Sequence, residues 1–345
     1  SAGVVSAARH LRVVQWTTGK TGSAAVRGMV GHPVIDLVGC YAYSPEKVGK
    51  DVGELCGIDP IGVTATDDIE ALLALEPDCV VYTAYRPNFD HIVRILESGA
   101  NMVASMYMLS GRGYGDEPTA RIRDAALRGG SSLYTSGIYP GHAPMVALAA
   151  SAMCSRIDRI SVLESLDIVG YANEQMFRAQ GFDLEPDDPE AAERCEASCG
   201  SFKDQIPVMA RALGVNLDGI GFEAEFAVAN EDTDFGFMTV GKGRIAGFRG
   251  TISGLMDGRS VIECRFVWKL GENMTPNWPV THGYVIEIEG EPGVRCRLEP
   301  LGEHFDGAVT TSMPIVNAIP AVCAAPPGIV NQMELPLVRG AHTIR

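Results

Sequence analysis

Short apolar runs and amphipathic stretches alternate along the chain from residue 11 to about residue 140. The apolar runs lie at 11–16, 35–41, 62–65, 78–83, 102–105 and 133–134. A strand buried on both faces is a nearly unbroken apolar run, whereas the segments between these runs repeat apolar residues at helical spacing. Strands that alternate with helices in this way predict βαβ units and a doubly wound parallel sheet.

The pattern changes near residue 145, where runs of alternating apolar and polar residues begin after a helical stretch at about 144–154. These runs lie at 160–169, 222–229, 245–252, 260–270, 283–288 and 294–298. Such alternation is typical of antiparallel strands with one solvated face. Helical stretches at 189–199 and 202–213 interrupt the runs, and one helical pattern returns at 309–323. We therefore expect a second, α+β domain with a mostly antiparallel sheet.

A glycine turn joins the first predicted strand to the first predicted helix in the stretch LRVVQWTTGKTGSAAVRGMV (11–30). A helix N-terminus presents free N–H groups and a partial positive charge to an anion. Glycine at 22 lets the helix pack closely on the strand, and glycine at 19 lets the backbone approach a pyrophosphate. A threonine stands where the G-x-G-x-x-G pattern has its first glycine. We predict a dinucleotide-binding turn formed by Thr17, Thr18, Gly19, Lys20, Thr21 and Gly22.

The end of the second predicted strand bears on the identity of the dinucleotide. NAD sites usually carry a carboxylate about 20 residues after the glycines, where it binds the ribose 2′-hydroxyl. Here the hydroxyl of Ser44 and the charges of Lys47 and Lys50 take that place, which favours NADP. Glu46 lies in the same turn and leaves NAD as the alternative. A solvated turn with incidental lysines is the competing interpretation.

Residues after the fourth and fifth predicted strands complete the expected cofactor site. Ligands bind at the carboxyl ends of the strands in an open α/β sheet. The residues at that edge are Thr83, Ala84, Tyr85, Arg86 and Ser105. For the arginine, an exposed position at a helix start is the competing interpretation.

These observations divide the 345 residues into a tail and two domains, because a chain of this length is long for one hydrophobic core. We expect a flexible tail at 1–10 and a dinucleotide-binding Rossmann domain at 11–144, to which 306–345 return. A domain for substrate binding and dimerisation is expected at 145–305. Residues 1–10 lack the apolar core of a signal peptide, and no apolar run reaches the ~18 residues of a membrane span.

The net charge bears on which binding partners are expected, and the cysteine content bears on the cellular compartment. A formal net charge of −15 disfavours a nucleic-acid surface or an anionic membrane. Nine cysteines without a disulfide framework indicate a reducing cytoplasm. Cys195 and Cys199 have no second pair to complete a zinc site, and the seven histidines show no metal-binding spacing, so we predict no metal.

Four motifs give the chain a family resemblance. They are WTTGKTG at 16–22, YSPEKVGKDVGEL at 43–55, SGIYPGH at 136–142 and VNAIPAVCAAPPGI at 316–329. With these motifs the chain resembles the dihydrodipicolinate-reductase-like NAD(P) oxidoreductases, in the branch of 2,4-diaminopentanoate dehydrogenase and native amine dehydrogenases. The resemblance implies a Rossmann domain, an α+β substrate domain, a homodimer and reversible hydride transfer between nicotinamide and a C–N centre.

One segment departs from the family pattern. The resemblance implies a carboxylate just after the fifth strand, which would steer ammonia or a substrate ammonium and handle its proton. Here that segment is NMVASMYM (101–108), and no acid follows before Asp116. Tyr107 falls at or beside the expected position and can donate a proton, so we expect it to polarise the substrate heteroatom. An aromatic pocket wall is the competing interpretation.

Other candidates are expected around a pocket between the two domains, where ligand pockets often lie. Tyr139 and His142 flank Pro140-Gly141 at the expected domain junction, and an imidazole titrates near neutrality, which suits a general acid. A packing or helix-capping role for the histidine is the alternative. The residues expected to line the pocket are Met106, Met108, Glu164 and Tyr171.

The sequence thus predicts an NAD(P)-dependent oxidoreductase, with NADP favoured. It would move a hydride to or from a C=N, C=O or activated C=C centre of a small, mostly apolar substrate. The alternative is a non-catalytic NADP-binding or sensing protein on the same fold, because fold alone does not establish catalysis. The expected partners are a small-molecule substrate and a second copy of the chain.

Overall fold

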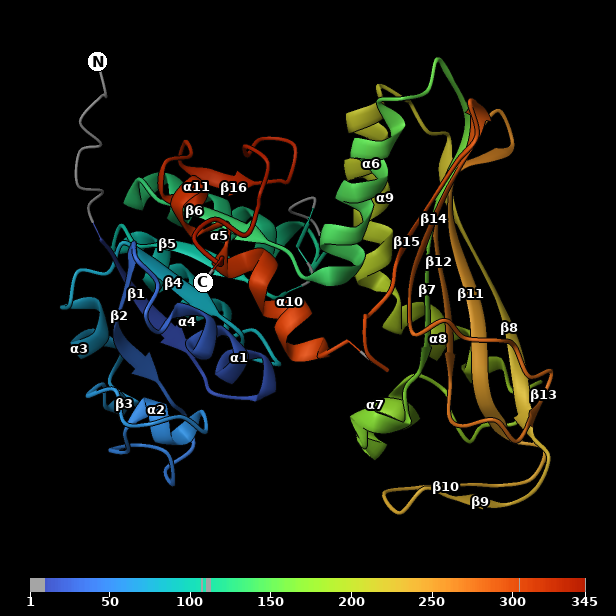
Figure 1. The fold of residues 1–345 in the computed structure, drawn as a ribbon, viewed down its shortest axis with the longest axis horizontal. Coiled ribbons are helices and arrows are strands. Elements are labelled where there is room, and N and C mark those ends of the chain that lie inside the picture. The colour runs from blue at the N-terminus through green and yellow to red at the C-terminus, as the bar shows by residue number, and fades with distance from the viewer. Residues whose placement is uncertain (1–9, 107, 110–112, 304, 345) are drawn as a thin grey trace. The chain divides into compact units, whose positions relative to one another are not determined.

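The computed structural model describes residues 10–106, 108–109, 113–303 and 305–344 and divides the chain into two compact units. The first unit is Ser1–His142 with Asp306–Arg345, and the second is Ala143–Phe305. Nearly all of the tail expected at 1–10 lies outside the described residues. Each unit contains its own seven-stranded sheet (Figure 1).

Seven parallel strands form the sheet of the first unit, in the order β16-β6-β5-β4-β1-β2-β3. They are β1 (Leu11–Trp16), β2 (Ile35–Tyr41), β3 (Ala65–Thr66), β4 (Cys79–Tyr82), β5 (Asn101–Ala104), β6 (Ser132–Thr135) and β16 (Gly328–Val330). In the sheet, β2 and β3 lie on one side of β1, and β4, β5, β6 and β16 lie on the other side. That reversal is the switch point at which α/β sheets bind ligands. The predicted doubly wound parallel sheet is confirmed.

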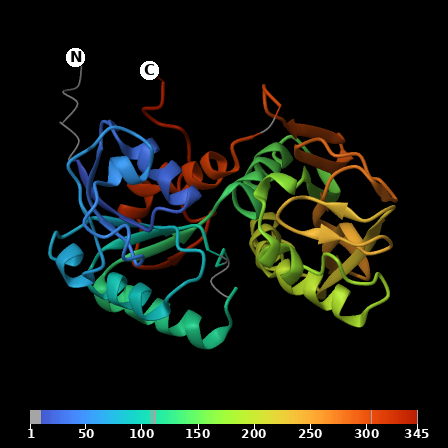
Figure 2. The same cartoon turned by 90° about the horizontal axis from the view of Figure 1, so that it is seen from below.

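Alternate residues along these strands point into two separate helix layers. One layer contains α3 (Ile69–Leu73), α4 (Phe89–Glu97) and α5 (Asp116–Gly129); the other contains α1 (Lys20–Met29), α10 (Gly307–Val316) and α11 (Ile319–Cys323). Figure 2 shows both layers, with α1 in blue on one side of the sheet and α5 in green on the other. Val13 and Val14 are both fully buried, one in each layer. Because each such side chain contributes roughly 1.5–3 kcal/mol on burial, both faces of the sheet belong to the core.

The C-terminal segment differs from the single helix predicted at 309–323. It forms two helices, α10 and α11, with a break at residues 317–318. Pro320 lies in the first turn of α11, where its missing N–H is tolerated, whereas in a continuous helix it would remove an interior hydrogen bond. The chain then forms β16, which pairs in parallel with β6 and which the sequence pattern did not predict.

The sheet of the second unit is mixed and has the order β13-β8-β11-β12-β7-β14-β15. Its strands are β7 (Arg156–Asp167), β8 (Gly219–Ala229), β11 (Ile245–Met256), β12 (Arg259–Lys269), β13 (Met274–Thr275), β14 (Gly283–Glu291) and β15 (Val294–Leu298). Within it, β7 and β12 pair in parallel and the other pairs are antiparallel. The predicted mostly antiparallel sheet is confirmed. Alternation within one strand does not encode its partner, so the parallel pair was not predicted.

Helices of the second unit pack on one face of this sheet (Figure 1). The longer ones are α6 (Ala143–Ser151), α8 (Pro189–Ser198) and α9 (Gly200–Leu213); short elements are α7 (Glu174–Ala179), β9 (Thr233–Asp234) and β10 (Thr239–Val240). The covered face carries an aromatic layer. Phe248, Phe266 and Trp268 have ring centroids 5.3–5.7 Å apart, and Phe202 of α9 packs on the last two. None of the helices in the described ranges has the length and apolar content needed to cross a membrane.

Candidate functional site

The turn between β1 and α1 holds Thr17 in a left-handed backbone conformation. Its φ is +73°, a region in which a residue other than glycine is uncommon and strained. Thr17 occupies the position of the first glycine of the dinucleotide motif, which is needed for the tight turn. The chain therefore makes this turn with a threonine and must hold the strain by other contacts.

Gln15, which the sequence analysis did not single out, supplies those contacts. Its fully buried side-chain amide donates to the carbonyl oxygen of Thr17 at 2.9 Å and to Oγ1 of Thr83 at 2.8 Å. The Thr83 hydroxyl donates in turn to the carbonyl oxygen of Trp16 at 3.0 Å. Thr83 therefore stabilises the turn through hydrogen bonds with the Gln15 amide and the Trp16 carbonyl oxygen. The only signal in the sequence is one amide within the apolar run 11–16.

The two glycines of the turn differ in what surrounds them. A Cβ at Gly22 would lie 2.2 Å from the carbonyl oxygen of Thr17 and 2.7 Å from Oγ1 of Thr83, so this position requires glycine. A Cβ at Gly19 would meet nothing within 4 Å. Gly19 is the N-cap of α1 and, within the described structure, brings no side-chain acceptor to the first N–H groups of the helix. Open space and these N–H donors fit an anionic pyrophosphate.

Lys47 places its ammonium group on the glycine turn. Nζ donates to the carbonyl oxygen of Thr18 at 3.1 Å and lies 3.3 Å from Oγ1 of the same residue. The backbone N–H of Lys47 donates to the carbonyl oxygen of Ser44 at 2.9 Å, so both residues predicted to bind a 2′-phosphate belong to one turn. Lys50 and Glu46 are exposed. The structure thus brings a cation to the glycine turn.

The residues after β4 lie at the carboxyl edge of the sheet and differ in how far they are buried. Ala84 is half-buried, whereas Tyr85 and Arg86 are exposed. Ser105, directly after β5, is half-buried, and its N–H donates to the carbonyl oxygen of Tyr82 at 3.2 Å. These residues follow β4 and β5 at the carboxyl edge of the sheet, and their contact with a cofactor stays a prediction.

The predicted proton donor, Tyr107, lies outside the described residues. Its neighbours Met106 and Met108 are 5% and 1% exposed and belong to the apolar core of the first unit. That environment gives the two methionines a packing role. A contact of either with substrate stays a prediction.

The turn Ile138–His142 is the last segment of the first unit before the chain enters the second unit at Ala143. Tyr139 and His142 are both half-buried, and the backbone N–H of His142 donates to the carbonyl oxygen of Gly137 at 2.7 Å. Burial lowers the pKa of the His142 imidazole below its ordinary value. The ring is therefore neutral at pH 7 and suits a proton acceptor better than the general acid expected from the sequence.

Glu164 and Tyr171 belong to the second unit. Glu164, in β7, is buried and accepts a hydrogen bond from Nε1 of Trp268 at 2.8 Å. Burial raises the pKa of Glu164 to about 7, against the lowering effect of hydrogen bonds from Trp268 and Tyr284. Tyr171 is 50% exposed, and its pKa is raised to about 12 by partial burial and by the charge of Glu164.

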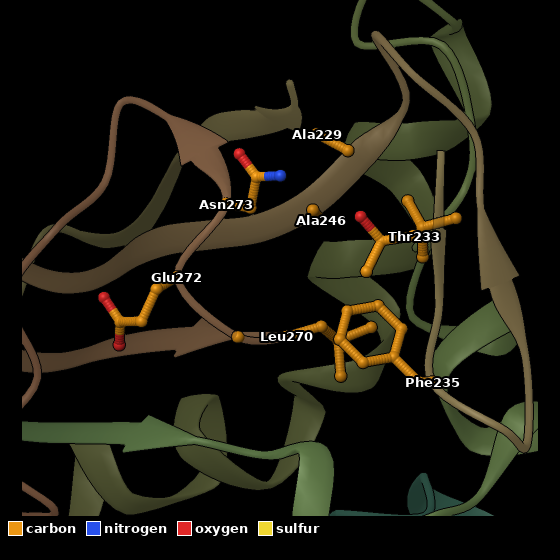
Figure 3. A pocket seen from close by; sticks show the side chains of 9 residues that line it. Ala229, Thr233, Phe235, Ala246, Leu270, Glu272 and Asn273 are labelled. Atoms are coloured by element: carbon orange, nitrogen blue, oxygen red, sulfur yellow. The ribbon is translucent and has the colours of Figure 1, made fainter. Parts of the chain in front are cut away.

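Two hollows in the second unit lie away from all of these residues. The first encloses about 60 Å³ beside Phe235, Leu270 and Glu272 (Figure 3). The second encloses about 340 Å³ and is lined in part by Arg156 and Met256. Ligand pockets usually span roughly 300–1,000 Å³, so the first is too small for a substrate. In the described ranges, no three His, Cys, Asp or Glu side chains are grouped to hold a metal ion.

Comparison with known proteins covers both units. Residues 13–106 match the family described as dihydrodipicolinate reductase, N-terminus, and residues 144–343 match the 2,4-diaminopentanoate dehydrogenase C-terminal domain. An amine dehydrogenase from Streptomyces virginiae is 32% identical over 353 aligned positions, which cover 95% of this chain and 96% of that protein. The resemblance inferred from the four motifs is therefore confirmed.

Solved structures share the fold. The amine dehydrogenase from Mycobacterium smegmatis superposes with a TM-score of 0.78 at 22% identity, covering 97% of this chain and 98% of that one. The WlbA dehydrogenase from Bordetella pertussis, solved with NADH and UDP-GlcNAcA, superposes with a TM-score of 0.51 at 14% identity, covering 92% and 83%. The chain therefore belongs to the family of nicotinamide-dependent oxidoreductases that contains 2,4-diaminopentanoate dehydrogenase and the amine dehydrogenases.

Proposed function

We propose that this oxidoreductase prefers NADP and moves a hydride to or from a C=N, C=O or activated C=C centre of a small, mostly apolar substrate. The observation that carries the cofactor preference is the Lys47 ammonium, 3.1 Å from the carbonyl oxygen of Thr18 on the glycine turn. A phosphate oxygen bonded to an ammonium forms a charge-assisted hydrogen bond, about twice as strong as a neutral one. The net charge of −15 makes such a local cation necessary for binding an additional phosphate.

The residues of the first unit fit a bound dinucleotide. The N–H groups at the start of α1 and the open backbone at Gly19 would hold the pyrophosphate. Ser44 and Lys47 would hold the 2′-phosphate, and 83–86 with Ser105 would border the remaining half of the cofactor. When bound, the nicotinamide supplies or accepts the hydride.

The proton that accompanies the hydride needs a residue of the chain. Tyr107 is our candidate for the donor to the substrate heteroatom, because a phenol can donate a proton and the segment 101–108 contains no carboxylate. Tyr139 and His142 are the further candidates. The neutral imidazole of His142 could receive the proton when the reaction runs toward oxidation.

We also infer a homodimer formed through the second sheet. On the face opposite α6 and α9, Leu163 of β7 stands beside Val285 of β14 and Arg265 of β12. Glu287 lies on the same face, so a two-fold related copy could match apolar with apolar groups and cation with anion. Light scattering should give the dimer mass for the wild type and the monomer mass for Leu163→Glu. A monomeric wild type would contradict this part of the proposal.

The test of the proposed function is NADPH oxidation with small ketones, with and without ammonia, and with enones. We expect turnover of at least one of these classes and faster turnover with NADPH than with NADH. NADPH that binds without being oxidised across the whole panel would favour the non-catalytic alternative.

A further inference from the structure

The larger hollow of the second unit, of about 340 Å³, lies at the end of α9. The helix ends at Leu213, because Gly214 takes a left-handed conformation with a φ of +67° and caps it. Beyond this end, the hollow is lined by the ends of strands, among them Arg156 of β7, Met256 of β11 and Arg259 of β12. Ligand pockets usually span roughly 300–1,000 Å³, so this hollow has room for a small organic molecule.

Apolar side chains form much of the lining. Leu213, Val215 and Met256 are half-buried, and Ile262 is fully buried. A hydrocarbon group placed against half-buried apolar side chains would remove their remaining apolar surface, and its own, from water, and this transfer is favourable. The lining therefore favours a ligand with a hydrocarbon part.

Arg156 and Asp158 carry opposite charges in the same lining and pair with each other. Nε of Arg156 lies 3.1 Å from Oδ1 of Asp158, and Nη2 lies 3.1 Å from Oδ2, so the contact is bidentate. A bidentate pair engages both carboxylate oxygens and fixes the plane of the guanidinium group. Together the two residues add no net charge to the hollow.

Arg259 is the second cation of the lining, and a tight turn fixes its place. It stands directly opposite Met256 across the two-residue turn Asp257-Gly258, whose φ values of +51° and +71° are typical of a type I′ hairpin. The backbone N–H of Asp257 donates to Oδ2 of Asp218 at 2.6 Å and holds the turn. Among the described residues, no acid pairs with the Arg259 side chain. Its guanidinium group is therefore available to a ligand anion.

We propose that this hollow binds a small organic carboxylate, with its charged group on Arg259 and its hydrocarbon chain against the apolar lining. The planar fork of a guanidinium group matches the two oxygens of a carboxylate. Two arginines and one aspartate leave one positive charge in excess in the lining, which disfavours an amine. A polyphosphate would need more cations against the net charge of −15. All lining residues belong to the second unit, so the proposal goes beyond the proposed function and does not depend on it.

Calorimetric titration of the intact protein with hexanoate tests the proposal. We expect saturable binding that is at least about tenfold tighter than that of acetate, because acetate lacks the methylene groups that the apolar lining would bury. Hexanol and hexylammonium share the chain of hexanoate but lack its negative charge. Both should bind at least about tenfold more weakly than hexanoate, because neither forms the charge-assisted hydrogen bonds with Arg259.

Variants of the lining locate the bound hexanoate. Arg259→Gln should weaken hexanoate at least about tenfold and leave hexanol unchanged, whereas Arg259→Lys keeps the charge and should restore part of the affinity. Val215→Asp places a carboxylate in the apolar lining and should also weaken hexanoate at least about tenfold. Lys242→Gln removes a positive charge from another exposed position of the second unit. It is the matched control and should bind hexanoate like the wild type.

Two results would overturn the proposal. The first is hexanoate affinity that is equal in Arg259→Gln and the wild type, or hexanoate binding that does not saturate. The second is acetate affinity equal to that of hexanoate, because an arginine alone would then account for the binding. None of these measurements involves hydride transfer, so the outcome for this site is separate from the outcome for the proposed function.

Discussion

Nζ of Lys47 donates a hydrogen bond to the carbonyl oxygen of Thr18 at 3.1 Å, although the two residues are 29 positions apart. The contact ties the turn after β2 to the glycine turn after β1. These two segments flank the switch point of the parallel sheet, where a dinucleotide binds in such folds. The cation at this place is the basis of the first prediction.

The Ser44→Ala/Lys47→Ala double variant should lose NADPH affinity roughly 10- to 100-fold, because charge-assisted hydrogen bonds contribute about 1.5–3 kcal/mol. The affinity for NADH, which lacks the 2′-phosphate, should change much less. Calorimetric titration with each cofactor measures both. Lys242→Ala, an exposed lysine of the second unit, is the control and should bind NADPH like the wild type. Equal losses for the two cofactors would refute the assignment.

Gly22→Ala and Gly19→Ala should affect different properties. The new Cβ at position 22 would lie 2.2 Å from the carbonyl oxygen of Thr17, so we expect a loss of about 1–3 kcal/mol in the free energy of unfolding. At position 19 the Cβ meets nothing and φ is −71°, so stability should hold while NADPH affinity falls. Chemical denaturation and cofactor titration measure the two effects. A Gly19→Ala protein that binds NADPH normally would remove this backbone from the pyrophosphate site.

Tyr107→Phe tests the proton donor. Turnover should fall about 10²-fold or more, because general acid catalysis typically contributes that factor, while NADPH affinity stays unchanged. Steady-state kinetics with the best ketone of the panel gives the first quantity and calorimetry the second. Wild-type turnover in the variant would remove Tyr107 from the mechanism and leave it as a pocket wall.

The stability of the protein should depend on pH through Glu164. Burial raises the pKa of this carboxyl from 4.5 to about 7, so the folded state holds its proton more tightly than the unfolded chain does. The stability gained from that proton is fully present below about pH 4.5 and is lost as the pH rises through about 7. Glu164→Gln cannot ionise and should gain up to about 3 kcal/mol on the wild type across this window. A difference in unfolding free energy that is the same at pH 4.5 and pH 8 would contradict the shift.

Much of the first unit could be predicted from the sequence because its strands are buried on both faces. Such strands are nearly unbroken apolar runs. The strand β4 (CVVY) is fully apolar and buried, and β1, β2 and β5 depart from this pattern only at Arg12, Gln15, Asp36 and Asn101. The three-residue strand β16 has no such run, because its position is set by pairing with β6 rather than by its own pattern. The parallel pairing of β7 with β12 is likewise a property of the assembled sheet.

In the candidate site, too, some features follow from local sequence patterns and others depend on the tertiary structure. The glycine turn is a local pattern and was predicted from seven residues. The hydrogen bond from the Gln15 amide to the Thr83 hydroxyl joins residues 68 positions apart, and no periodic pattern in the sequence predicts it. Glu164 alternates with apolar residues like any solvated acid on a strand. Its burial depends on the aromatic layer under α9, which only the tertiary structure supplies.

Deuterium transfer tests the central claim most directly. The protein is incubated with a small ketone, with and without ammonia, or with a small enone, and with NADPH that carries deuterium at one or the other C4 position of the nicotinamide. The products are analysed by mass spectrometry. The account predicts a reduced product with deuterium on the carbon that received the hydride, formed from one of the two labelled cofactors. Absence of a deuterated amine, alcohol or saturated ketone with both labelled cofactors would contradict it.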